Sequence, residues 1–267
     1  MSSPLNLTEI RKYVIELTSK AGEILKGYFL SENFKHISKG GVDFLTQADQ
    51  EVDEFLVKNL KKQYSGTDFL TEETAPADYS HFRQLDYVWI IDPLDGTVNF
   101  SRGNPNFTIS IGLVKKGKSI LGVIYLPIEN KVYWAQEDLD GAFLNGKPIK
   151  VSKTADLKET VIGCDWGWNI EKRLIVASWL SLIVTHVRQV KSLGSASSEL
   201  ASLAAGQMDV YIHSGLKPWD VAASVLLIEK AGGRITTATG EGYNIFNPDL
   251  VASNGILHEE VLKLINE

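Results

Sequence analysis

The apolar positions at the start of the chain follow the pattern of an amphipathic helix. Between residues 7 and 29 apolar side chains recur three or four positions apart, as one buried face of a helix requires. Asn6 is a suitable N-cap, and Glu9 follows it at capping-box spacing. A second face of this kind predicts a helix over residues 49–60, and residues 33–42 are expected to form the loop between the two helices.

The centre of the chain alternates short apolar runs with turns, which predicts β-strands. Asn145-Gly146 between two further strand-like segments is typical of a type I′ hairpin. Short connections join most of these strands, so this part of the sheet is expected to be antiparallel. Strands are expected at residues 68–71, 87–91, 107–115, 119–126 and 131–136.

The last part of the chain alternates strands with helices, which predicts a sheet covered by helices. No repeat or linker interrupts the sequence. We therefore expect one compact domain over residues 1–267, with an N-terminal part at about 1–150 and a C-terminal part at about 151–267. Strands are expected at residues 160–163, 187–190, 210–213, 234–237 and 251–252, and helices at 171–184, 197–205, 219–231 and 258–265.

Composition narrows the possible partners. The net charge is −6, and no Lys/Arg-rich patch indicates nucleic-acid binding. Cys164 is the only cysteine, which excludes an internal disulfide and suits a reducing, cytoplasmic environment. No run is apolar and long enough to predict a membrane span. An acidic protein that binds phosphate must create a positive field locally, and a bound metal ion would supply one.

Candidate chemistry gathers where the apolar run of residues 87–91 ends. Asp92 and Pro93 follow it, and the proline is expected to stop the strand because it cannot donate to a sheet. Asp95 comes three residues after the first carboxylate, and Gly96 permits a tight turn before a short helix at Thr97. Carboxylates bind Mg²⁺, and a helix N-terminus binds phosphate. For Asp-x-x-Asp alone, an ordinary turn with a capping aspartate would be the preferred explanation.

The longer motif is more specific. Residues 89–100, Trp-Ile-Ile-Asp-Pro-Leu-Asp-Gly-Thr-Val-Asn-Phe, resemble the signature of the inositol monophosphatase family of Mg²⁺-dependent, lithium-sensitive phosphatases. Residues 43–49 are similar to the family's Asp-x-x-Thr-x-x-Asp segment. Pro-Trp-Asp at 218–220, followed by Ala-Gly-Gly at 231–233, resembles its second signature. The similarity thus extends from residue 39 to residue 233 in the family's order.

The resemblance implies an α/β fold, a five-layer α-β-α-β-α sandwich, and a homodimer. It implies Mg²⁺-dependent hydrolysis of a small phosphate monoester, with inositol 1-phosphate as the first candidate and Li⁺ as an inhibitor. Sibling activities on fructose 1,6-bisphosphate, a 3′-phosphonucleotide or histidinol phosphate use the same phosphate site. A non-catalytic binding protein is the alternative of a different class. Every expected metal and water-activating position holds a competent residue, which argues against it.

The resemblance also implies roles for individual residues. Asp49 and Thr97 would orient and activate the attacking water, and Glu72 would serve both the metal and the reaction; Glu73 is the less favoured acid of that pair. The residues implied as metal ligands are Glu72, Asp92, the Leu94 carbonyl, Asp95 and Asp220. Those implied in substrate binding are Asp95, Gly96, Thr97, Gly194, Ser195, Ala196, His213 and Asp220.

His213 departs from the family pattern. Relatives specialised for inositol phosphate carry Glu at the matching place, where it accepts hydrogen bonds from substrate hydroxyls. A protonated imidazole here would instead favour a second anionic group. The plainer alternative is that His213 points elsewhere and that Ser214 or Lys217 meets the substrate. Four tryptophans are expected to pack in the core: Trp166, Trp168, Trp179 and Trp219.

Overall fold

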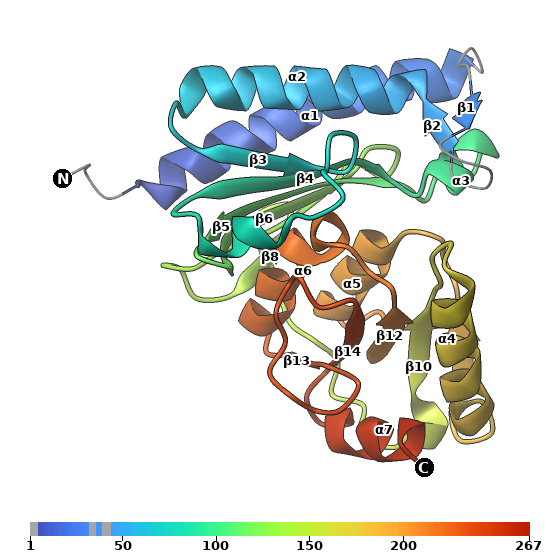
Figure 1. Cartoon of the computed structure of the whole chain (residues 1–267). Coiled ribbons are helices and arrows are strands. Elements are labelled where there is room, and N and C mark those ends of the chain that lie inside the picture. Colours follow the sequence, from blue (N-terminus) through green and yellow to red (C-terminus); the bar gives the residue numbers. More distant parts are fainter. Residues whose placement is uncertain (1–4, 32–35, 39–43) are drawn as a thin grey trace.

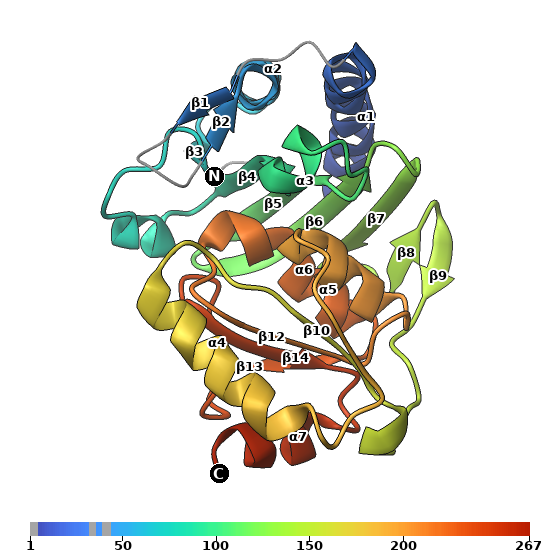
Figure 2. The same cartoon turned by 90° about the vertical axis from the view of Figure 1, so that its right-hand side faces the viewer.

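Two β-sheets alternate with three layers of helices in the computed structural model, which describes residues 5–31, 36–38 and 44–267 (Figures 1 and 2). The order of layers is α-β-α-β-α, so the predicted five-layer sandwich is confirmed. Of the predicted loop at residues 33–42 the structure describes only 36–38, which form a strand and not a loop, and Asp43 of the similar segment lies outside the described residues. None of the described helices is both long and apolar enough to cross a membrane.

The first outer layer consists of α1 (Leu7–Ser31) and α2 (Gln47–Gln63), which cover one face of a seven-stranded sheet (Figure 1). Only β3 and β4 are parallel neighbours, and the remaining pairs are antiparallel, as predicted. Asn145 and Gly146 both have positive φ, at 48° and 75°, as a type I′ hairpin requires. The strands in sheet order are β3 (Asp68–Thr71), β4 (Val88–Asp95), β5 (Thr108–Lys115), β6 (Lys118–Leu126), β7 (Lys131–Gln136), β8 (Ala142–Leu144) and β9 (Lys147–Ile149). A separate pair is formed by β1 (His36–Ser38) and β2 (Phe44–Thr46).

Strand β4 does not stop at Pro93, so that prediction was wrong. The strand runs on to Asp95, and its pairing with β5 shifts between Asp92, opposite Ser110, and Asp95, opposite Thr108. Between these two pairs β4 has one residue more than β5, which is a β-bulge. A proline can occupy a bulge because no hydrogen bond of the sheet is lost there. The bulge bends the end of β4 and so changes the direction of the Asp95 side chain.

The middle layer holds α5 (Ala196–Ala204) and α6 (Pro218–Lys230), between the two sheets (Figure 2). Helix α6 is buried along almost its whole length, which explains its apolar residues on all sides. It approaches the large sheet at Gly122, where an added Cβ would lie 2.3 Å from the Ala223 carbonyl oxygen. Glycine therefore sets the close distance between this helix and the sheet, and with it the position of the helix N-terminus.

The second sheet has the order β11-β10-β12-β14-β13, and α4 and α7 cover its outer face (Figure 1). Strands β11, β10 and β12 are parallel, and β14 runs antiparallel to both its neighbours. Strand β11 begins two residues later than predicted. The elements are β10 (Val161–Cys164), α4 (Ile170–Ile183), β11 (Gln189–Lys191), β12 (Val210–Ser214), β13 (Arg234–Thr236), β14 (Asp249–Ser253) and α7 (His258–Ile265). Short helices are α3 (Thr97–Ser101), η1 (Ser80–Gln84) and η2 (Leu157–Glu159).

Candidate active site

One cavity of about 700 Å³ receives the ends of elements from both sheets and the middle helices. The end of β4, the start of α3, the start of α5, the end of β12 and the start of α6 all contribute to its wall. Glu72 lies on the wall, whereas its neighbour Glu73 is not among the lining residues. The predicted site residues that line the cavity are Glu72, Asp92, Leu94, Asp95, Gly96, Thr97, Gly194, Ser195, Ala196, His213 and Asp220.

Asp49 is the one predicted site residue that does not line the cavity. It is the third residue of α2 and only 2% exposed. Its charge nevertheless acts on Asp92, whose pKa it helps to raise. Asp49 thus lies outside the cavity wall but within electrostatic reach of Asp92.

Asp92 is the most strongly perturbed carboxyl group of the floor. It is 1% exposed, and its Oδ1 accepts a hydrogen bond from the Leu94 backbone N–H at 3.0 Å. Burial raises the pKa of Asp92 well above its ordinary value, and the negative charges around it raise the pKa further. Those charges belong to Glu72, Asp95, Asp220 and Asp49, in decreasing order of effect. Carboxylates crowded in this way favour a bound cation.

Asp95 joins the large sheet to helix α5. Its Oδ2 accepts bonds from Ser195 Oγ at 2.8 Å, from the Ser197 N–H at 2.7 Å and from Ser197 Oγ at 2.5 Å. These bonds lower the pKa of Asp95, but burial outweighs them and leaves it raised. Because all three bonds go to Oδ2, Oδ1 is the oxygen that can bind a cation. Ser197 was not predicted, since a serine in the first turn of a helix is ordinary.

Gly96 and Thr97 form the turn that opens α3. Gly96 has φ of 101°, and an added Cβ would lie 3.1 Å from the Asn106 carbonyl oxygen, so a side chain is excluded here. The Thr97 hydroxyl donates to the Leu94 carbonyl at 3.2 Å. This hydroxyl therefore lies directly beside a predicted metal ligand and at the start of the predicted phosphate-binding turn.

The turn at Gly194 is held from two sides. Asp165 Oδ2 accepts from the Gly194 N–H at 2.6 Å, and Asn99 Nδ2 donates to the Leu193 carbonyl at 2.7 Å. Gly194 has φ of 76°, and an added Cβ would lie 2.9 Å from Asn99 Nδ2. Ser195 then caps α5, and its Oγ accepts from the Ser198 N–H. Asp165 was not predicted, because nothing in the sequence relates the end of β10 to this turn.

Glu199 supports the same turn from within the core. It is fully buried, and its Oε1 accepts from the Leu193 N–H at 2.6 Å. Burial, followed by the charge of Asp165, raises the pKa of Glu199 to about 10, so the group is protonated at neutral pH. Gly163 makes room for it, since a Cβ there would lie 2.4 Å from Glu199 Oε2.

We expect Glu199→Gln to leave stability nearly unchanged and Glu199→Leu to lower it. Gln reproduces the shape and hydrogen bonding of a protonated Glu, whereas Leu leaves the Leu193 N–H without its partner. A buried group left unpaired costs about 1–3 kcal/mol. Urea unfolding at pH 7 measures both variants. Equal destabilisation by Gln and Leu would show that Glu199 is ionised in the folded protein.

Asp220 stands in the first turn of α6, where Pro218 is the first helical residue. Its Oδ2 accepts from the Lys217 N–H at 2.7 Å. Burial, followed by the charge of Asp95, raises the pKa of Asp220 to about 7. Metal binding at this carboxylate therefore competes with a proton near neutral pH.

His213 is neutral in this environment. It is 5% exposed, and burial lowers its pKa to about 4 even though Asp249 acts in the opposite direction. With its pKa lowered in this way, His213 would carry no charge at neutral pH with which to attract a second anionic group. Its Nδ1 has no hydrogen-bond partner among the residues that the structure describes, and the side chain lines the cavity. A neutral imidazole can offer a substrate hydroxyl one donor or one acceptor.

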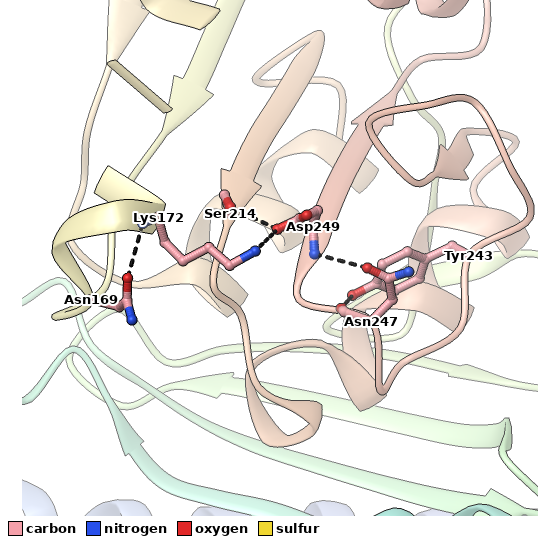
Figure 3. A network of polar contacts seen from close by, with 6 residues as sticks. All are labelled: Asn169, Lys172, Ser214, Tyr243, Asn247 and Asp249. Atoms are coloured by element: carbon pink, nitrogen blue, oxygen red, sulfur yellow. Dashed lines mark hydrogen bonds and ion pairs between the residues drawn. The ribbon is translucent and has the colours of Figure 1, made fainter. Parts of the chain in front are cut away.

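A polar network includes three residues of the cavity wall, Asn169, Lys172 and Ser214 (Figure 3). Asp249 Oδ1 binds Lys172 Nζ at 2.9 Å and accepts from Ser214 Oγ at 2.6 Å. Asn169 Oδ1 accepts from the Lys172 N–H at 3.0 Å and caps α4. Asn247 Oδ1 accepts from the Asp249 N–H at 3.1 Å, so the network extends into the loop before β14. The start of α4 is thereby tied to the ends of two strands.

The cavity floor fits an oxygen-binding divalent cation. Glu72, Asp92, Asp95 and Asp220 all line the cavity, and each has a carboxylate side chain. Within the described ranges no three His, Cys, Asp or Glu side chains are grouped tightly enough to form a preformed metal cage. Mg²⁺ does not need such a cage, because it keeps several waters and uses one or two carboxylates together with substrate phosphate. The donor set thus suits Mg²⁺ better than a thiolate- or imidazole-binding metal.

Comparisons with known proteins identify the family of the chain. The inositol monophosphatase family model matches residues 6–267. Fructose-1,6-bisphosphatase/inositol-1-monophosphatase of Thermotoga maritima is 33% identical, over 96% of this chain and 95% of that protein. Inositol monophosphatase 1 of Homo sapiens is 30% identical, over 96% of this chain and 94% of that protein. The crystal structure of extragenic suppressor protein suhB from Bartonella henselae matches with a TM-score of 0.89 and 28% identity, over 97% of this chain and 99% of that one. The chain belongs to the inositol monophosphatase family, whose members are phosphatases that hydrolyse phosphoric monoesters.

Proposed function

We propose that the protein hydrolyses a small phosphate monoester in an Mg²⁺-dependent reaction, with inositol 1-phosphate as the favoured substrate. The supporting observation is the meeting of four carboxylates, from Glu72, Asp92, Asp95 and Asp220, in one cavity beside the opening turn of α3. We propose further that the protein acts in the cytoplasm, which accords with its free and buried Cys164. We also propose that it is a homodimer of single-domain chains.

The carboxylates and the Leu94 carbonyl would hold the metal. When bound, Mg²⁺ lowers the pKa of a coordinated water and offsets negative charge on the phosphoryl and leaving oxygens. The backbone N–H groups of Gly96 and Thr97 would hold the phosphate. Asp49, through the Thr97 hydroxyl, would draw the proton from the attacking water.

The remaining wall would meet the leaving alcohol. Ser195 and Ala196 stand at the start of α5, next to the Asp95 carboxylate, and His213 stands at the end of β12. Ser195 Oγ already donates to Asp95, so its orientation is fixed before substrate binds. A polyol placed between the α5 turn and the imidazole would be held through its hydroxyls.

A panel of phosphate esters tests the proposal. Phosphate release is measured with and without Mg²⁺ on inositol 1-phosphate, fructose 1,6-bisphosphate, a 3′-phosphonucleotide and histidinol phosphate. The relative from Thermotoga maritima carries both fructose-1,6-bisphosphatase and inositol-1-monophosphatase in its name, which makes the bisphosphate the first sibling to test. We expect Mg²⁺-stimulated release, highest with inositol 1-phosphate. No stimulated release from any ester would support a non-catalytic binding protein instead.

We expect His213→Glu to raise kcat/KM for inositol 1-phosphate about tenfold relative to the other esters. A carboxylate offers two acceptors to substrate hydroxyls, and one hydrogen bond to a charged group contributes about 1.5–3 kcal/mol. His213→Gln is the matched neutral control. The Mg²⁺ requirement should be unaltered in both variants. An unchanged ranking of substrates in His213→Glu would show that this departure from the family pattern has no bearing on specificity.

A further inference from the structure

One buried serine gives two of its hydrogen bonds to the same oxygen of Asp95. Ser197 is the second residue of α5 and is fully buried. Its backbone N–H and its hydroxyl donate to Asp95 Oδ2 at 2.7 and 2.5 Å, and Ser195 Oγ donates to that oxygen at 2.8 Å. A carboxylate oxygen has two lone pairs, so three donors leave Oδ2 no capacity to bind a cation as well.

A second buried hydroxyl supports Ser197 from the large sheet. Thr108 is the first residue of β5 and is fully buried. Its Oγ1 lies 2.5 Å from Ser197 Oγ. A carboxylate can only accept, so the single hydroxyl proton of Ser197 goes to Asp95, and Thr108 must be the donor to Ser197. The hydrogen bonds thus run from Thr108 to Ser197 to Asp95, and we name these three side chains the hydroxyl chain.

The hydroxyl chain joins three elements of the core. Thr108 of β5 lies directly opposite Asp95 of β4, and both side chains reach Ser197 on helix α5 of the middle layer (Figure 2). The bulge in β4 precedes Asp95, so the regular pleat of the sheet does not by itself set the direction of this carboxylate. The hydroxyl chain sets it instead, and it does so in the absence of a cation.

A carboxylate held in this way can bind a cation through only one oxygen. Ca²⁺ takes about six to eight oxygen ligands in flexible geometry and accepts both oxygens of a carboxylate. Mg²⁺ is smaller and demands near-octahedral geometry, which suits a carboxylate that presents a single oxygen. The choice between the two ions depends on the number and flexibility of the ligands, and the hydroxyl chain restricts both.

We propose that Ser197, supported by Thr108, is a positioning residue that restricts Asp95 to metal binding through Oδ1 and so favours Mg²⁺ over Ca²⁺. The inference rests on the proposed function, in which Asp95 is a metal ligand. It goes beyond that function because it assigns part of the choice of cation to a hydroxyl whose residue does not line the cavity.

Titration calorimetry of the metal-free protein with MgCl₂ or CaCl₂ tests the proposal. Ser197→Ala keeps the backbone N–H bond to Asp95 and removes only the hydroxyl. Mutation of a residue that hydrogen-bonds to a metal ligand lowers metal affinity or activity about 10–100-fold. We therefore expect Ser197→Ala to weaken Mg²⁺ binding about tenfold or more. Ca²⁺ binding should weaken about threefold or less, because Ca²⁺ can use the oxygen that is released.

Two substitutions of Thr108 test the hydroxyl chain and leave Ser197 in place. Thr108→Val keeps the shape of the side chain and removes the donor to Ser197, so Mg²⁺ affinity should fall about three- to tenfold. Thr108→Ser keeps the hydroxyl and should retain the wild-type affinity for both ions. Equal losses in the two variants would assign the effect to packing of the threonine methyl group and would overturn the proposal.

Ser119→Ala is the matched control. Ser119 is also a buried serine that joins the large sheet to a middle helix, since it lies on β6 and donates to the Ala222 carbonyl at 2.7 Å. It does not line the cavity. The variant should lose stability in urea unfolding and keep its affinity for both ions. A shift of the Mg²⁺/Ca²⁺ preference in Ser119→Ala as large as that in Ser197→Ala would show a general effect of lost packing and would overturn the proposal.

The remaining outcomes separate this inference from the proposed function. Wild-type Mg²⁺ affinity in Ser197→Ala, equal losses for both ions, or a wild-type protein that binds neither ion would each overturn the inference. If no ester is hydrolysed but Ser197→Ala loses the wild-type preference for Mg²⁺, the phosphatase proposal fails and the role of Ser197 stands. If Mg²⁺-dependent hydrolysis occurs but Ser197→Ala binds both ions as the wild type does, only the inference about Ser197 fails.

Discussion

Asp92→Asn is expected to abolish Mg²⁺-dependent phosphate release while stabilising the metal-free protein. Asn keeps the size of the side chain and can still accept the bond from the Leu94 N–H, but it removes one charge from a buried, crowded floor. Mutation of a residue that only hydrogen-bonds to a metal ligand already lowers metal affinity or activity about 10–100-fold. Removal of the charge of the ligand itself should therefore lower kcat at least about 100-fold. The same change removes repulsion among the carboxylates when no metal is bound.

The sign of the pH dependence follows from the raised pKa values. In the metal-free protein the pKa of Asp92 is raised, and the pKa of Asp220 is about 7. Folding therefore favours the protonated groups. Their stabilising contribution is fully present below the ordinary carboxyl pKa of about 4 and, for Asp220, is lost as the pH rises through 7. Mg²⁺ binds the ionised carboxylates. The rise in Tm that Mg²⁺ causes should therefore increase between about pH 4 and pH 7, and it should be smaller in Asp92→Asn than in the wild type.

Thermal unfolding with EDTA or Mg²⁺, together with phosphate release, tests both effects. Asp209→Asn is the matched control, since Asp209 is also buried but lies outside the cavity wall and accepts from the Val161 N–H at 2.7 Å. That control should lose stability and keep its response to Mg²⁺. An Asp92→Asn enzyme with turnover within a few-fold of the wild type at saturating Mg²⁺ would remove Asp92 from the metal ligands.

The sequence predicts the elements well because most of them are specified locally. Apolar periodicity defines α1, and the Asn145-Gly146 pair defines its hairpin turn. The error at Pro93 has a different origin. Whether a proline ends a strand or occupies a bulge depends on the register of the neighbouring strand β5, and that register is not local information.

The site is less accessible to sequence reasoning than the fold. Asp92 and Asp95 share one motif, but only the topology brings Asp220 to them, and its role was inferred through resemblance. No sequence pattern pointed to Asp165 or Glu199. They accept hydrogen bonds from the N–H groups of Gly194 and Leu193, respectively, and these contacts exist only in the folded chain.

Two tryptophans were placed wrongly for a similar reason. Trp166 and Trp168 were expected in the core but are 49% and 43% exposed, whereas Trp179 and Trp219 are buried as predicted. Both exposed rings belong to the β10–α4 loop, and a ring in a loop packs or projects according to what lies over it.

Asp49→Asn and Thr97→Ala are each expected to lower kcat strongly while changing KM only a few-fold. Asp49 is buried outside the cavity wall, and Thr97 lines the cavity with its hydroxyl 3.2 Å from the Leu94 carbonyl oxygen. In the proposed reaction both residues act on the attacking water and not on the leaving alcohol. Removal of a general base or of its relay costs about 10²–10⁴-fold in rate.

Steady-state kinetics on inositol 1-phosphate at saturating Mg²⁺ measures both variants, and Thr97→Ser is the matched control. Serine keeps the hydroxyl that would relay the proton, so it should recover most of the lost kcat, while alanine cannot. An effect confined to KM would show that the pair binds substrate. A fall in kcat that serine fails to recover would show that the threonine methyl group acts through packing, and Asp49 would then need another route to the water.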